Sequence, residues 1–162
     1  METEHRYMVQ ASSTLPRSGV LRSEGIEPAI VFSAPPEFNG RAGHWTPEHF
    51  LVAAVASCFV STFSGIAEIS RFPFDSLHLE TEGVLARDET GLRFQKMILR
   101  PLVMIAHEED RERTLRILQK AEKSCLIARS LTCPLEMHPE IAVEPACAEC
   151  EGGEEALSIL SC

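Results

Sequence analysis

The chain has 162 residues, of which 44% are hydrophobic, and its formal net charge at pH 7 is −9. This length and apolar content fit one domain with its own hydrophobic core. Because the chain is acidic and no stripe of Lys and Arg is expected to displace counterions from phosphates, nucleic acid is not an expected partner.

The N-terminal residues and the apolar stretches indicate the cellular compartment in which we expect the protein. Residues 1–7 lack the apolar run of a signal peptide, and no stretch is expected to reach the roughly 18 charge-free residues that cross a bilayer. We therefore expect a cytoplasmic protein without membrane contact. In that compartment the six cysteines are held mainly as thiols, and any disulfide is transient or catalytic.

The first 45 residues combine turn-forming residues with short β-type runs. These runs lie at residues 7–11, 19–22 and 29–32, and Ser23, Glu24 and Gly25 separate the last two as a turn does. The pattern predicts a β-hairpin or meander.

A helix is predicted from Thr46 to about Ser70. Thr46 is a favourable N-cap, Pro47 suits the first helical position, and Glu48 places a carboxylate in the first turn. Small or apolar residues occupy nearly every face of the middle of this segment, which predicts a central, buried helix.

The pattern then changes to strands. Alternation from Ser76, the turn at residues 88–91 and the run at 92–105 predict a long antiparallel hairpin. Residues 108–124 have the periodicity of an amphipathic helix, and residues 135–143 are predicted to form a last strand. We expect one α+β domain over residues 1–143, followed by an acidic, cysteine-containing tail at 144–162.

Two cysteines lie in helix-like segments 67 residues apart. Cys58 lies in a nearly charge-free run, where a cysteine is ordinarily a compact buried hydrophobe. Cys125 follows a charged helical pattern. Both cysteines can be packing residues, or they can form a redox pair. The second alternative requires a thiolate at Cys58, which burial disfavours unless a cation or hydrogen-bond donor lies nearby.

Glu48 precedes Cys58 by ten residues on the same predicted helix. On a straight helix this separation is about 15 Å, with a rotation of about 280°, so the two side chains do not meet within one chain. Glu48 is then either a first-turn carboxylate that complements the helix dipole, or a residue that meets the Cys58 of a second subunit.

Two motifs resemble a known family. The Pro-Glu pair at 47–48, the Ala-rich apolar stretch that follows it and Cys58 resemble the helix of OsmC-like proteins, the osmotically inducible and organic hydroperoxide resistance family. The segment from Cys125 to Leu131 is similar to the second cysteine segment of that family. Gly25 with its following β run and residues 35–37 resemble its N-terminal region, so the resemblance covers about residues 7–143.

The resemblance implies an OsmC-like α+β fold in which antiparallel sheets pack around a long central helix and two chains intertwine as a homodimer. It also implies a thiol-dependent peroxidase that reduces organic hydroperoxides, lipid hydroperoxides among them. Cys58 would be the peroxidatic cysteine and Cys125 the resolving one. A dithiol reductant, for which the family suggests a lipoylated protein, would reopen their disulfide.

In such peroxidases an arginine held by the glutamate stabilises the thiolate. Arg17 is the best positional match here, with Glu48 as its partner, but the family's Gly-Gly-Arg pattern is missing and Arg22 is a rival. The alternative function is therefore an OsmC-fold stress-response or ligand-binding protein without efficient peroxidase activity.

The remaining cysteines carry weaker signals. Cys133 is expected to be structural. In the tail, Cys147 and Cys150 form a lone Cys-x-x-Cys pair, with Cys162 at the end of the chain; without a second spaced pair this is a weak zinc signal, and an accessory redox pair or an incidental tail are the other interpretations. We expect no cofactor and no bound metal.

Overall fold

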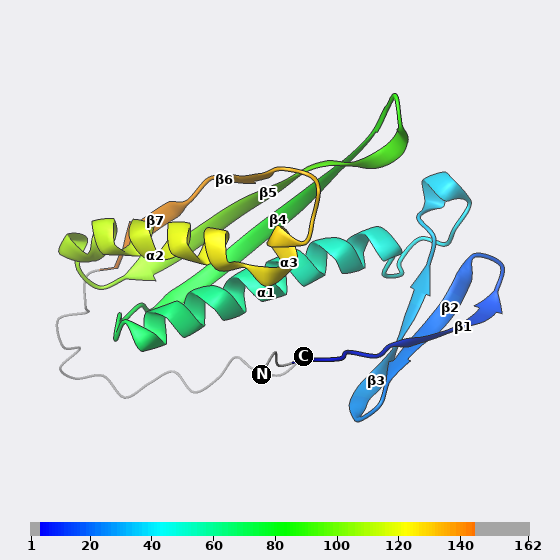
Figure 1. Cartoon of the computed structure of the whole chain (residues 1–162), viewed down its shortest axis with the longest axis horizontal. Helices are drawn as coiled ribbons and strands as arrows, with labels where there is room; N and C mark the ends of the chain where they lie inside the picture. The colour runs from blue at the N-terminus through cyan, green and yellow to red at the C-terminus, as the bar shows by residue number, and fades with distance from the viewer. Residues whose placement is uncertain (1–3, 145–162) are drawn as a thin grey trace, which may run out of the picture.

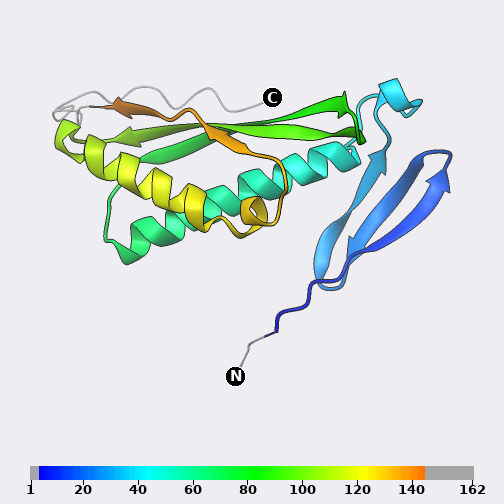
Figure 2. The same cartoon turned by 45° about the horizontal axis from the view of Figure 1, so that its top comes forward.

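The computed structural model describes residues 4–144, and these form an α+β fold (Figure 1). The chain begins with three antiparallel strands, β1 (Gln10–Leu15), β2 (Ser18–Ser23) and β3 (Ile26–Ser33), in the order β1-β2-β3. The predicted meander is confirmed, but its first strand begins three residues later than expected. This small sheet stands apart from the other elements (Figure 2).

A short 3-10 turn, η1 (Pro36–Phe38), leads to the long helix α1 (Pro47–Ile69). The predicted start is confirmed, because the hydroxyl of Thr46 accepts a hydrogen bond from the backbone N–H of His49 at 3.3 Å. Burial on nearly every face is not observed within this chain. The buried residues of α1 follow one stripe at four-residue spacing, namely Val55, Phe59, Phe63 and Ala67.

The second sheet is built on the predicted hairpin, β4 (Ser76–Asp88) and β5 (Gly91–Ile105). The expected last strand is divided into β6 (Leu135–Met137) and β7 (Glu140–Val143), which both pair with β5 in parallel, so this sheet is mixed. Pro139 lies between them, and a proline has no N–H to donate to a strand ladder.

Helices α1 and α2 cover one face of the second sheet (Figure 2). The predicted helix at 108–124 begins as a 3-10 turn, η2 (Glu108–Asp110), and continues as α2 (Arg111–Ser124); the short α3 (Leu126–Arg129) follows directly. The core lies between these helices and β5. It includes Phe59 and Phe63 of α1, Met97 and Leu99 of β5, and Leu118 of α2.

The expectation that no stretch reaches roughly 18 charge-free residues is wrong for α1. Residues 50–67 carry no charged side chain, and α1 is long and apolar enough to cross a membrane by length and composition alone. In this structure 22% of its most apolar window is buried. The outward face carries hydroxyl and carboxylate groups, those of Ser57, Ser61, Ser64 and Glu68.

Candidate active site: two thiols where three helices meet

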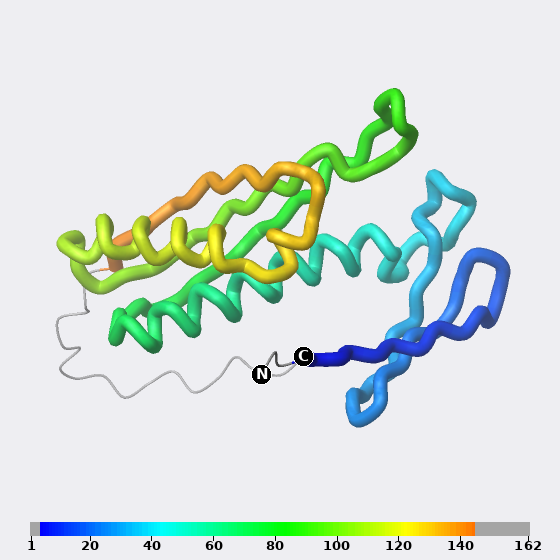
Figure 3. The backbone as a smooth tube through the Cα atoms, in the orientation of Figure 1, coloured from blue at the N-terminus to red at the C-terminus, as the bar shows by residue number. Residues whose placement is uncertain are grey.

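The fold brings Cys58 and Cys125 together. Cys58 lies in the middle of α1 and is half-buried, whereas Cys125 occupies the junction of α2 and α3 and is fully buried. Helix α3 lies against the middle of α1 (Figures 1 and 3). Because the chain turns sharply at Cys125, α3 starts beside the sulfur of Cys58. Both cysteines are free thiols in this structure.

Hydrogen-bond donors surround the sulfur of Cys58. The backbone N–H of Ile127, in the first turn of α3, donates to Cys58 Sγ at 3.5 Å. Burial raises the pKa of the Cys58 thiol, but donors from Ile127, the Cys125 thiol and the Thr62 hydroxyl, with the backbone N–H of Leu126, outweigh it, so the pKa is lowered from its ordinary value. The thiolate of Cys58 is therefore stabilised by neutral donors.

The pKa of the Cys125 thiol is shifted in the opposite direction, upward from its ordinary value. Burial raises the pKa of its thiol, and the hydrogen bond and the charge of Cys58 raise it further. Adjacent thiols with pKa values pushed apart give one sulfur that ionises first and one that keeps its proton. Here the ionising sulfur is the more exposed one.

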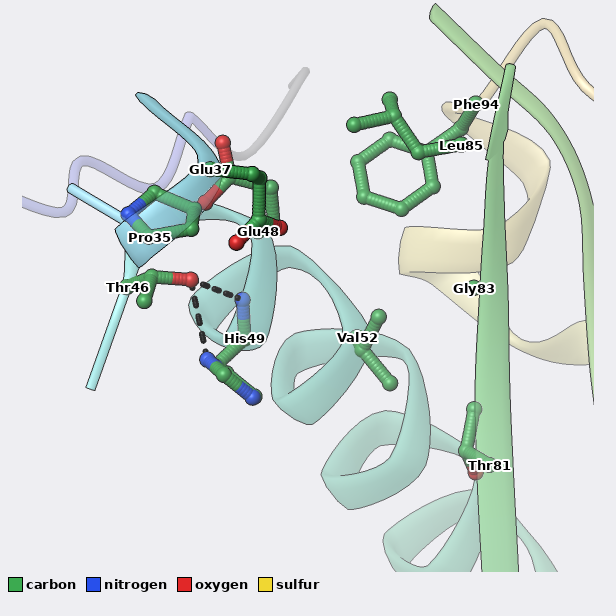
Figure 4. Close-up of a pocket in the computed structure, with 10 residues that line it drawn as sticks. All are labelled: Pro35, Glu37, Thr46, Glu48, His49, Val52, Thr81, Gly83, Leu85 and Phe94. Carbon is green, nitrogen blue, oxygen red and sulfur yellow. Dashed lines mark hydrogen bonds between the residues drawn. The ribbon is translucent and has the colours of Figure 1, made fainter. Parts of the chain in front are cut away.

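Glu48 lies in a separate cavity. This cavity has a volume of about 310 Å³ and is formed by the start of α1, the preceding loop and the β4–β5 hairpin (Figure 4). Apolar groups from Val52, Leu85 and Phe94 form much of its wall, and Glu37 lies beside Glu48 at the start of α1.

One oxygen of the Glu48 carboxylate, Oε2, is buried and has no hydrogen-bond partner within residues 4–144. A buried carboxylate oxygen without a donor is costly, so this position suits a cation or N–H donor from another molecule. Glu48 and Cys58 are ten residues apart on one helix, and the structure does not bring them together within a chain.

Arg17 is also away from Cys58 in this chain. It belongs to the turn between β1 and β2, in the sheet that stands apart, and its Nη1 donates to the carbonyl oxygen of Phe38 at 3.0 Å. Its backbone φ is 59°, in the left-handed region that non-glycine residues seldom adopt. The rival Arg22 lies in β2 and is exposed. Neither arginine contributes to the lowered pKa of Cys58.

The sequence did not identify the donors that reach Cys58. Thr62 carried a usable signal, since a residue four positions after Cys58 lies on the same helix face. The N–H of Ile127 is a backbone group, and its role depends on where the chain turns at Cys125. Cys133 is half-buried against the core, consistent with a structural role. The tail cysteines, Cys147, Cys150 and Cys162, lie outside the described residues.

Comparison with known proteins assigns the family. The sequence profile of the OsmC-like protein family matches residues 40–140, which is more than half of the chain and includes both thiols. The chain belongs to this family. A curated relative, the uncharacterized protein YmaD of Bacillus subtilis, is 26% identical over 144 residues, spanning 87% of this chain and 96% of YmaD.

Solved structures agree on the OsmC-like fold. An OsmC-like protein of unknown function from Vibrio cholerae superposes with a TM-score of 0.76 at 20% identity, over 84% of this chain and 99% of that one. An organic hydroperoxide resistance protein, OsmC, from Legionella pneumophila superposes with a TM-score of 0.70 at 17% identity, over 88% of this chain and 100% of that one. The organic hydroperoxide resistance protein OhrB of Bacillus subtilis superposes with a TM-score of 0.63 at 18% identity, over 85% of this chain and 98% of that one.

Proposed function

We propose that this chain is a cysteine-based peroxidase that reduces organic hydroperoxides, with Cys58 as the peroxidatic cysteine and Cys125 as the resolving cysteine. The observation that carries the proposal is the position of Cys58 Sγ, which accepts the Ile127 N–H at 3.5 Å beside a second, buried thiol. The names of two similar structures, both organic hydroperoxide resistance proteins, support the choice of substrate.

The chemistry follows from the two pKa values. The Cys58 thiolate attacks one peroxide oxygen, the O–O bond breaks, and the alkoxide takes a proton and leaves as an alcohol. Cys58 is then a sulfenic acid. The sulfur of Cys125 attacks it and water leaves, which closes the Cys58–Cys125 disulfide. A dithiol, for which the family suggests a lipoylated protein, supplies two electrons and restores both thiols.

A homodimer would complete the site. Arg17 and Glu48 lie away from Cys58 within one chain, whereas a second copy could bring its own Arg17 and Glu48 to this sulfur. One feature supports that arrangement. Glu48 Oε2 is buried without a donor in residues 4–144. The guanidinium would stabilise the thiolate and the leaving alkoxide.

A stoichiometric experiment tests the proposal. Reduced full-length protein is treated with one equivalent of cumene hydroperoxide, alkylated, and analysed by mass spectrometry for disulfides. We expect Cys58 and Cys125 to be joined, the Cys58→Ser variant to lose turnover, and the Cys125→Ser variant to accumulate the sulfenic acid. If both cysteines remain thiols in the wild-type protein, the proposal is wrong. The Cys133→Ser variant is the matched control and should behave as the wild type.

One observation favours the alternative, an OsmC-fold stress-response or ligand-binding protein. No arginine within residues 4–144 contributes to the lowered pKa of Cys58. The rate of Cys58 alkylation as a function of pH separates the two functions. A midpoint below that of a free cysteine, about 8.5, supports the peroxidase, and a midpoint at or above it supports the binding protein.

A further inference from the structure

The segment that carries Cys125 is basic, although the chain as a whole is acidic. Residues 113–135 contain five Arg or Lys side chains and one carboxylate, a formal charge of +4 in a chain whose total is −9, so the rest of the chain carries −13. An acidic partner is therefore attracted to this segment and repelled by the remainder of the chain.

Four of these cations are exposed on the two helices that meet at Cys125. Arg116, Lys120 and Lys123 recur at positions i, i+4 and i+7 of α2 and therefore share one face of that helix. Arg129 ends α3, just beyond Cys125. We call these four residues the basic surface. The expectation from the sequence that the chain lacks a Lys and Arg stripe is thus wrong for this face of α2.

Most of the charge on the basic surface is not neutralised. Arg116 lies 3.6 Å from Glu112, and both side chains are exposed, so this pair is weak. Among residues 4–144 the other three cations make no ion pair. Three unpaired cations close together favour a ligand that brings carboxylates.

An exposed apolar side chain lies within this surface. Leu126 follows Cys125 and is 66% exposed, and Lys123 and Arg129 lie three residues to either side of it in the chain. An apolar side chain with charged neighbours has the composition of a protein–protein contact, in which an apolar centre is bordered by polar groups. The basic surface and Leu126 together therefore suit a protein partner.

The two thiols are reached beside the same segment. Cys125 is fully buried and Cys58 is half-buried, so a reductant of their disulfide attacks the sulfur of Cys58. The N–H groups of Leu126 and Ile127 donate to that sulfur, which places the start of α3 beside it. Because the second copy of the proposed homodimer covers the outward face of α1, the reductant approaches beside α3.

We propose that the basic surface and Leu126 form the docking site of an acidic protein that carries the reducing dithiol. This inference rests on the proposed function and adds the chemistry of the reductant, which presents carboxylates around its dithiol. The carboxylates pair with the unpaired cations, and an apolar side chain of the carrier covers Leu126. Docking in this way holds the dithiol beside Cys58.

The exchange at the docked site is balanced. One carrier thiolate attacks Cys58 Sγ, the Cys58–Cys125 bond breaks, and Cys125 leaves as a thiolate and takes a proton. The second carrier thiol loses its proton and attacks the carrier sulfur of this mixed disulfide, which releases the Cys58 thiolate. The carrier ends as a disulfide, and its two electrons restore both thiols of this chain.

A binding measurement tests the docking without redox chemistry. The probe is a fluorescent peptide in which glutamates flank two serines in place of the dithiol, and its neutral counterpart has glutamines instead. We expect the reduced full-length protein to bind the acidic peptide in preference to the neutral one, and salt to weaken the binding. The Lys120→Gln/Lys123→Gln variant should bind about ten-fold more weakly. The matched control, Arg87→Gln/Arg93→Gln at the tip of the β4–β5 hairpin, should bind as the wild type.

Cross-linking locates the bound peptide. The chain has three lysines, Lys96, Lys120 and Lys123. Lys96 is an internal control because it is already paired with Glu136 at 3.0 Å. We expect a carbodiimide to join the glutamates of the peptide to Lys120 or Lys123. Links to Lys96 alone, or no links, overturn the proposal. Tighter binding of a single-stranded oligonucleotide than of the acidic peptide also overturns it, because the surface would then be a nucleic-acid site.

Reduction kinetics test the role of the docking. The Cys58–Cys125 disulfide is reduced by the acidic peptide with its dithiol in place, by the neutral dithiol peptide, or by uncharged dihydrolipoamide. We expect the acidic peptide to be the fastest of the two peptides. The Lys120→Gln/Lys123→Gln variant should slow reduction by the acidic peptide on the order of ten-fold and leave the rate with dihydrolipoamide unchanged. Equal rates for the two peptides with the wild type overturn the proposal.

The failure of this inference and the failure of the proposed function are distinguishable. If cumene hydroperoxide forms the disulfide but the two peptides reduce it equally fast, the peroxidase stands and the docking site is wrong. If the peroxide oxidises neither thiol, the proposed function fails. The disulfide is then formed with diamide, and the preference for the acidic peptide, with its loss in the lysine variant, supports or overturns the docking site independently.

Discussion

At the scale of single residues, the feature that sets the chemistry is the set of neutral donors around Cys58. A thiolate in an apolar helix is destabilised by desolvation, and a nearby cation is the usual compensation. In this chain the compensation comes from the Ile127 and Leu126 amides, the Cys125 thiol and the Thr62 hydroxyl. Their combined effect exceeds that of burial, so the thiol ionises below its ordinary pKa.

The Thr62 hydroxyl provides a test of this balance. In the Thr62→Val variant, a donor to the thiolate is lost while the shape of the side chain is kept, so the pKa of Cys58 should rise and its thiolate fraction at pH 7 should fall. Because a hydrogen bond to a charged group is worth about 1.5–3 kcal/mol, we expect alkylation of Cys58 at pH 7 to slow on the order of ten-fold.

The control for this variant is Ser61→Ala, which removes an exposed hydroxyl from the adjacent position of α1. Its alkylation rate should equal that of the wild type. Equal rates for Thr62→Val and the wild type would show that the hydroxyl does not stabilise the thiolate.

At the scale of elements, α1 and β4 approach closely because Gly83 has no side chain. A Cβ at this position would lie 2.6 Å from Cε1 of Phe94 and 2.8 Å from Cγ2 of Val52. Both distances are too short for carbon atoms, so the Gly83→Ala variant should overpack the wall of the Glu48 cavity. We expect it to lower the free energy of unfolding by about 1–3 kcal/mol, measured by urea denaturation.

A second substitution checks the mechanism of that loss. Val52→Ala removes the Cγ2 atom that a Cβ at position 83 would meet, and combining it with Gly83→Ala should recover part of the stability. The coupling between the two changes should therefore be favourable. Strictly additive losses would mean that the gap between α1 and β4 does not limit the packing.

The elements differ in how well the sequence predicted them. Thr46, Pro47 and Glu48 predicted the start of α1 because capping is local, and the turn at 88–91 predicted the β4–β5 hairpin for the same reason. The division of the last strand was missed although Pro139 signals it. Apart from Thr62, which lies on α1 itself, the donors to Cys58 depend on the chain at 125–127 lying against α1, and no local pattern encodes that contact.

At the scale of the whole molecule, two surfaces of this chain lack partners among the described residues. The small N-terminal sheet stands apart, and its Leu15, Ile30 and Val31 are exposed. The outward face of α1 is the second surface, since 22% of the most apolar window of that helix is buried. Exposed apolar side chains such as those of the small sheet are typical of chains that associate. A second copy covering α1 would also account for the unpaired oxygen of Glu48.

A bulky side chain placed on the outward face of α1 tests the homodimer. Ser61 is small and exposed at the middle of the outward face, so the Ser61→Tyr variant should prevent close approach of a second copy while leaving the buried stripe of the helix unchanged. We expect the wild-type protein to have the mass of a dimer in light scattering, and the variant to have that of a monomer. The matched control is Gln119→Tyr, at an exposed site on α2, which should remain dimeric. The homodimer across this face is wrong if the wild-type protein is a monomer, or if the Ser61→Tyr variant is still a dimer. Arg17 and Glu48 of a second copy would then not reach Cys58 across this face. The Cys58 thiolate would depend on its neutral donors alone.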